Sequence, residues 1–243
     1  MTEPVTTTVS AGPGAVPDSP PGSLHQLFET ARRELVLEGR AGEVWGIVIP
    51  FGALALILLP LALGPDVPLL ARVGPAVFWV VALLFGMLIA LRQSSADPAE
   101  LRDLQRLLEV DPAARLVGKA LAGAVWLLGL LLVLGAATVV LYAPAIPVRW
   151  WMVPVVLMLV ALGVAMAATL AGEVAAGLRS RSTLAPLLAA PLGIPVLVAA
   201  AETTDRLQVG GSILTPTLLL VMVDLILAIV IVLAAGPLED ATS

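Results

Sequence analysis

Long apolar runs separated by short polar segments are the main pattern of this chain. A hydrocarbon core about 30 Å thick requires about 20 helical residues, and the runs are close to this length. Backbone groups inside lipid must be hydrogen-bonded within the spanning segment, which favours helices. The pattern therefore predicts an all-α, polytopic membrane protein with six transmembrane helices, at Val44–Gly64, Val73–Leu91, Leu116–Leu141, Trp150–Leu170, Leu184–Ala201 and Ile213–Ala235.

The chain before the first span has two parts. Residues 1–22 consist largely of Thr, Pro, Gly and Ser, and we interpret them as a disordered cytoplasmic tail ahead of one six-span domain at residues 23–243. Apolar side chains then recur at helical spacing, which predicts an amphipathic helix over residues 24–35 that lies on the membrane or packs against another subunit. Its apolar positions are Leu24, Leu27, Phe28, Ala31 and Leu35.

The longest polar segment between spans carries a second helix signal. An Asp that can cap a helix precedes a Pro suited to the first helical position and a Glu that can complete a capping box. A leucine stripe follows, so we predict a short amphipathic helix over residues 97–109. It is either an ordinary partly helical loop or a docking element for a groove on a cytoplasmic partner. The residues of this signal are Asp97, Pro98, Glu100, Leu101, Leu104 and Leu108.

Positive residues predict the orientation of the spans. With both termini in the cytoplasm, ten of the 13 Lys and Arg residues lie inside, and only Arg72, Arg149 and Arg206 lie outside. Such a bias is typical of cytoplasmic loops. The tryptophans mostly fall near predicted span ends, as membrane interfaces favour; they are Trp45, Trp79, Trp126, Trp150 and Trp151.

Composition excludes several kinds of chemistry. Hydrophobic residues make up 59% of the chain and charged residues 13%, against about 25% charged in an ordinary soluble domain. No basic patch suited to nucleic acid occurs, and the absence of Cys excludes thiolate metal sites. The single His, His25, has no second His to complete a haem or metal site. No phosphate-binding G-x-x-x-x-G-K-[ST] motif occurs, so this chain is not expected to hydrolyse ATP by itself.

Two acidic residues fall in or beside the spans, where ionisable groups are costly. Asp224 lies near the middle of the last span; it is either part of a substrate path or proton site, or a carboxylate that faces another helix or subunit. For Glu173, near the cytoplasmic end of the fourth span, the structural interpretation is favoured. An intramembrane enzyme that uses both acids is disfavoured, because no matched base, nucleophile or metal set accompanies them. The fifth span contains Pro186, Pro191 and Pro195, and we expect it to be broken or bent.

Several motifs resemble one known family. Leu59–Asp66 reads Leu-Pro-Leu-Ala-Leu-Gly-Pro-Asp, Leu69–Pro75 reads Leu-Leu-Ala-Arg-Val-Gly-Pro, and Trp79 follows. Further on, Gly-Leu-Arg occurs at residues 177–179, and Ala190–Leu197 contains Pro-Leu-Gly-Ile-Pro. Together these segments resemble the haem exporter protein B (CcmB) family of cytochrome c maturation, over roughly residues 31–201.

The resemblance implies a non-enzymatic permease subunit of an ABC transporter with the ABC-2-type exporter architecture. Residues 24–35 would then be the elbow helix and residues 97–109 the coupling helix that docks the ATPase. Implied partners are a cytoplasmic ATPase subunit that binds ATP, a haem-handling membrane protein with a tryptophan-rich signature, a small single-span membrane protein, a periplasmic haem chaperone and membrane lipid. Haem is the implied cargo, with no stably bound cofactor, and the implied location is the inner membrane. The alternative is a permease for another cargo, such as a lipid or a drug.

Overall fold

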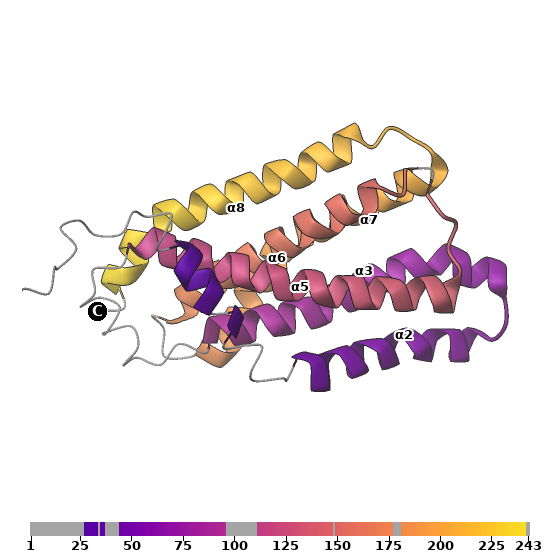
Figure 1. Ribbon diagram of the computed structural model, residues 1–243, viewed down its shortest axis with the longest axis horizontal. Helices are drawn as coiled ribbons and strands as arrows, with labels where there is room; N and C mark the ends of the chain where they lie inside the picture. Colours follow the sequence, from indigo (N-terminus) through magenta and orange to yellow (C-terminus); the bar gives the residue numbers. More distant parts are fainter. Residues whose placement is uncertain are drawn as a thin grey trace, which may run out of the picture.

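The computed structural model describes residues 27–33, 35–36, 44–95, 111–147, 149–176 and 181–241. Six helices in this part of the chain are long and apolar enough to cross a membrane, which confirms the predicted fold class. They run roughly along the long axis of the molecule (Figure 1). The elements are a π-helical turn η1 (Val44–Val48) that leads into α2 (Ile49–Leu63), then α3 (Val67–Ser95), α5 (Pro112–Tyr142), α6 (Met152–Ala176), α7 (Arg181–Val209) and α8 (Leu214–Ala241).

Helix α6 is the centre of the bundle. It packs against α3, α5, α7 and α8, whereas α2 packs on α3 and α5. Its buried face is rich in alanine, which lets neighbouring backbones approach closely, as is usual between helices in membranes. The outer faces of the other helices carry exposed apolar side chains that suit contact with lipid, among them Leu61, Val140 and Leu233.

The helices extend beyond the apolar runs. The second span begins at Val67 rather than Val73, because the Asp66 side chain accepts a hydrogen bond from the Leu69 backbone N–H at 3.1 Å and caps the helix. The third begins at Pro112 in the same way, since Asp111 accepts from the Ala113 N–H at 3.1 Å. Trp45, Trp150 and Trp151 lie near span ends, as expected of most tryptophans, whereas Trp79 and Trp126 lie well inside α3 and α5.

The fifth span differs most from its prediction. Helix α7 continues from Arg181 to Val209 through all three interior prolines, so of the two expected outcomes, a break or a bend, the break is absent. The segment after Ala201, expected to be an outer loop, forms the last turns of this helix. There Arg206 and Glu202 form an i,i+4 ion pair at 2.7 Å on the exposed helix surface. The three prolines lie on the exposed side of α7, while its other side packs against α6 and α8.

Tyr142 ties the end of α5 to α2. Its hydroxyl donates a 2.8 Å hydrogen bond to the Leu56 carbonyl oxygen, inside the bundle. In a helix that carbonyl would accept from the residue four positions later, which here is Pro60 and has no N–H. The tyrosine therefore supplies the donor that the proline removes. Gly74 on α3 leaves room for the tyrosine, because a Cβ there would lie only 2.6 Å from Tyr142 Cβ.

We expect Tyr142→Phe to lower the free energy of unfolding by about 1–3 kcal/mol, because it leaves the buried Leu56 carbonyl without a donor. Thermal unfolding in detergent, followed by tryptophan fluorescence, measures the loss. Thr138→Val is the control. Its buried hydroxyl donates to the Leu134 carbonyl within α5, and that carbonyl also accepts the helical N–H bond of residue 138. Equal losses in the two variants would contradict the role given to Tyr142.

Candidate functional site

A buried ion cluster joins the start of α5 to the end of α6. Lys119 Nζ lies 3.6 Å from Glu173 Oε1, and Arg115 Nη2 lies 4.0 Å from Glu173 Oε2. The side chains of Lys119 and Glu173 are only 4% and 5% exposed. Arg115 and Lys119 are four residues apart, so they share one face of α5. Opposite charges at this separation attract more strongly inside a protein than in water, so the cluster holds α5 and α6 together at this end of the bundle.

The cluster lies just after the predicted docking segment. Residues 96–110, which include Asp97, Glu100, Leu101, Leu104 and Leu108, lie outside the described residues. Asp111 caps α5, and Arg115 and Lys119 follow within the next two turns. A displacement of the preceding segment would therefore reach the first turns of α5 directly, and through Glu173 it would reach the central helix α6.

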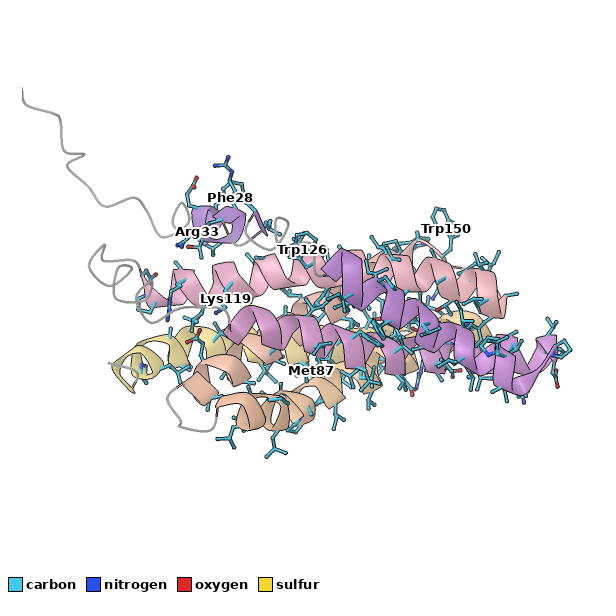
Figure 2. The ribbon with its side chains drawn as sticks, turned by 90° about the horizontal axis from the view of Figure 1, so that it is seen from below. Phe28, Arg33, Met87, Lys119, Trp126 and Trp150 are labelled. Atoms are coloured by element: carbon cyan, nitrogen blue, oxygen red, sulfur yellow. The ribbon has the colours of Figure 1, made fainter. Side chains whose placement is uncertain are left out.

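The amphipathic segment near the N-terminus packs at the same place. Residues 27–33 are helical and lie against the first half of α5 (Figure 2). A Cβ built on Gly118 would lie 3.0 Å from both the Leu27 carbonyl oxygen and Thr30 Cβ, so the two helices are in close contact. Leu27 and Leu35 are half-buried, whereas Phe28 is 68% exposed. Leu24 and His25 lie outside the described residues.

Asp224 occupies a separate position, in the middle of α8. It is 5% exposed, and neither carboxylate oxygen has a hydrogen-bond partner within the described part of the chain. Its Oδ1 faces Gly163 on α6 so closely that a Cβ on that glycine would overlap it. Glu173 lies ten residues further along α6, about 15 Å along the helix axis, so the two acids do not form a pair. Asp224 was a candidate from the sequence because it is an acidic residue within an apolar span. Nothing in the sequence indicated that Gly163 is its neighbour.

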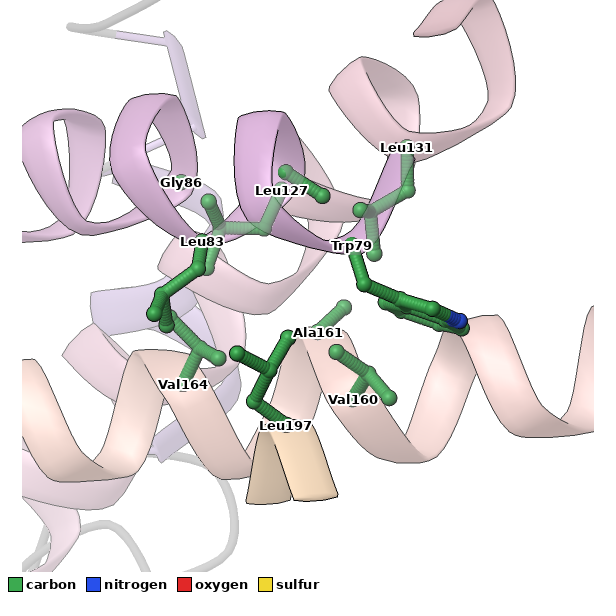
Figure 3. A pocket seen from close by; sticks show the side chains of 10 residues that line it. Trp79, Leu83, Gly86, Leu127, Leu131, Val160, Ala161, Val164 and Leu197 are labelled. Atoms are coloured by element: carbon green, nitrogen blue, oxygen red, sulfur yellow. The ribbon is translucent and has the colours of Figure 1, made fainter. Parts of the chain in front are cut away.

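The interior between the helices is closely packed. A cavity of about 10 Å³ lies where α3, α5, α6 and α7 meet, and its lining is apolar. This volume is near the minimum that a single water requires. Figure 3 shows the side chains that close around it: Trp79, Leu83, Leu127, Leu131, Val160, Val164 and Leu197. A larger apolar pocket opens toward the other end of the bundle, near the end of α5.

Comparison with known proteins identifies the family. The sequence model described as "CcmB protein" matches residues 25–238, which includes the last span. Heme exporter protein B of Rhodobacter capsulatus is 34% identical over 192 residues, which cover 77% of this chain and 86% of the relative. The protein of that name from Paracoccus denitrificans is 31% identical over 197 residues, with 79% and 88% covered. That from Haemophilus influenzae is 31% identical over 180 residues, with 74% and 81% covered. The chain belongs to the CcmB family.

Proposed function

We propose that this chain is the membrane-spanning permease subunit of an exporter that delivers haem for cytochrome c maturation. The observation that carries the proposal is the match to proteins named heme exporter protein B over most of both sequences. Six helices able to span a membrane suit a permease. The alternative cargo, a lipid or a drug, is not favoured, because the five curated relatives all carry the heme exporter name.

A separate cytoplasmic ATPase supplies the energy in this proposal, and this chain is not an enzyme. The sequence has no phosphate-binding loop of its own. Residues 97–109 dock the ATPase as a coupling helix, with Leu101, Leu104 and Leu108 placed in a groove of that subunit. Support comes from the leucine spacing, which suits helix-in-groove recognition, and from the position of this segment directly before α5.

In the proposed mechanism, the ion cluster transmits movement from α5 to α6. ATP-dependent movement of the ATPase displaces the coupling helix, and the displacement passes through Lys119 and Glu173 from α5 to α6. Because α6 packs against α3, α7 and α8, the bundle responds by rigid-body movement of its helices. We propose that this movement releases the loaded haem chaperone rather than carrying haem through the subunit. The absence of His and Cys from the spans, which leaves no such axial ligand for haem, supports this choice.

The proposed complex lies in the inner membrane. Besides the ATPase, it contains a haem-handling membrane protein with a tryptophan-rich signature and a small single-span protein, and it serves a periplasmic haem chaperone. Haem is cargo, ATP binds the partner, and this subunit holds no stable cofactor. Both termini are cytoplasmic, in line with the ten Lys and Arg residues on that side. Exporters of this kind need two six-span halves, so the chain pairs with itself or with another membrane protein.

Replacement of the three leucines tests the coupling helix. We expect Leu101→Asp, Leu104→Asp and Leu108→Asp together to abolish co-purification with the ATPase in mild detergent, because charged side chains cannot enter an apolar groove. The same variant should fail to restore c-type cytochromes in a strain that lacks this gene, as measured by haem staining. Arg106→Asp, on the face of the same predicted helix opposite the leucines, is the control and should retain both properties.

The two readouts separate the parts of the proposal. Undiminished co-purification of the triple variant would remove the coupling-helix assignment but leave the transport function standing. Normal c-type cytochromes in the strain that lacks the gene altogether would reject the transport function itself.

A further inference from the structure

An open apolar pocket of about 310 Å³ lies between α3, α5, α6 and α7, at the end of the bundle where α5 stops. This volume is within the range of about 300–1,000 Å³ that is usual for ligand sites. Its walls include Phe78 and Trp79 from α3, Leu132 from α5, Val153 from α6 and Leu207 from α7. The lining is almost wholly apolar, so the pocket suits a hydrocarbon body.

The aromatic wall of this pocket is held rigidly. The rings of Phe78 and Trp79 meet edge to face with their centroids 4.8 Å apart. Trp79 Nε1 donates a 3.1 Å hydrogen bond to Thr204 Oγ1 on α7, and that hydroxyl donates in turn to the Ala200 carbonyl at 2.8 Å. The indole is therefore fixed between two helices, and the pocket is formed before any ligand enters.

Neighbouring residues place the pocket at the membrane surface. Pro147, in the connection between α5 and α6, lines its mouth. Trp150 and Trp151 follow shortly after and are 68% and 59% exposed. Exposed tryptophans at a span end are typical of the boundary between headgroups and acyl chains. Figure 2 shows Trp150 at the opposite end of the bundle from Lys119, so the boundary lies in the leaflet away from the ion cluster.

A positively charged side chain, Arg149, lies close to the opening of the apolar pocket. A second hollow of about 200 Å³ shares Leu207 with the apolar pocket and is lined by Arg149 and Arg206. Arg206 is already bound to Glu202, with its Nε and Nη2 at 2.8 and 2.7 Å from Oε1. Arg149 is exposed and has no carboxylate partner among the described residues. A guanidinium of this kind is well suited to a phosphate oxygen.

We propose that the pocket binds one acyl chain of an anionic phospholipid from this leaflet, with the lipid phosphate on Arg149. The apolar lining, the depth set by the tryptophans and the adjacent cation together match such a molecule. Haem also combines an apolar body with acidic groups, but the described lining contains no His, Cys, Met or Tyr to ligate its iron. This inference goes beyond the proposed function and does not rest on it.

Photolabelling in nanodiscs tests the site. The probe is phosphatidylglycerol with a diazirine near the end of one acyl chain, added to the full-length protein in a phosphatidylcholine bilayer. We expect label on the α5 and α6 segments that line the pocket. Ala136→Phe, which fills the pocket, should remove this label. Val125→Phe should keep it, because Val125 lies three turns away on the same face of α5, is 54% exposed and does not line the pocket.

A second variant leaves the helix packing untouched. Arg149→Gln should weaken labelling by phosphatidylglycerol about fivefold, the effect of one cation near an anionic surface. Equal labelling of the Ala136→Phe and Val125→Phe variants, or undiminished labelling of Arg149→Gln, would overturn the proposal. Added haemin should leave the label in place, and its displacement by equimolar haemin would assign the pocket to haem instead of lipid.

Discussion

Glu173→Gln is expected to lower the free energy of unfolding by about 3–5 kcal/mol, because it removes the carboxylate that faces the buried Lys119 and the partly buried Arg115. Glutamine keeps the shape of the side chain, so the loss reports the charge rather than a cavity. Unlike a surface pair, this cluster is shielded from water and salt, so added salt should change the loss little. Thermal unfolding of the purified protein in nanodiscs, at low and high salt, measures both effects.

Glu202→Gln provides the matched control. It removes an equivalent carboxylate from the Arg206 pair, whose side chains are 51% and 40% exposed, and exposed pairs contribute only about 0–1 kcal/mol. Glu202 contacts its cation more closely than Glu173 contacts either of its two, so the large difference expected between the two variants comes mainly from burial. A loss at Glu173 no greater than that at Glu202 would show that the cluster does not hold α5 against α6.

The six spans are predictable from the sequence because the thickness of the bilayer sets a strict length for apolar helices. The ends of the helices are not predictable in this way, because a helix can continue beyond the hydrocarbon core of the bilayer. Arg72 lies outside the apolar run of the second span yet within α3, and Asp205 lies beyond the fifth run yet within α7. Polar residues at these positions stay helical in the interfacial region, so the charge pattern indicates the membrane boundary rather than the end of the helix.

The candidate site was predictable only in part. Glu173 is a candidate from the sequence because it is an acidic residue near the end of a span. Its partners could not be predicted, because they depend on the register of α5 against α6. One signal could have paired them: Arg115 and Lys119 lie near the start of one span, and Glu173 lies near the end of the next. Consecutive spans run in opposite directions, so these ends meet on the same side of the membrane. The cargo could not be predicted from any pattern of residues, because only the likeness to the family indicates haem.

Gly163→Ala should disturb the contact between α6 and α8 more than an added methyl group normally would. The new Cβ would overlap Asp224 Oδ1 on α8 and come within 3.0 Å of Val196 Cγ2 on α7. All three residues belong to buried helix faces, so the helices must shift or adopt strained rotamers. We expect a loss of about 1–3 kcal/mol in the free energy of unfolding, as for overpacked cores in general. Thermal unfolding in nanodiscs measures it.

Combining Gly163→Ala with Asp224→Ala tests whether the Asp224 carboxyl group causes the loss of stability. In the Asp224→Ala background the overlapping oxygen is absent, so the nearest atoms to the added methyl group at residue 163 are those of Val196, and the substitution should cost much less. The difference between the two backgrounds is the coupling energy of the pair. Gly129→Ala is the control, because a Cβ there meets nothing within 4 Å and alanine favours the helix by about 1 kcal/mol. An equal cost of Gly163→Ala in both backgrounds would mean that Asp224 does not set the distance between α6 and α8.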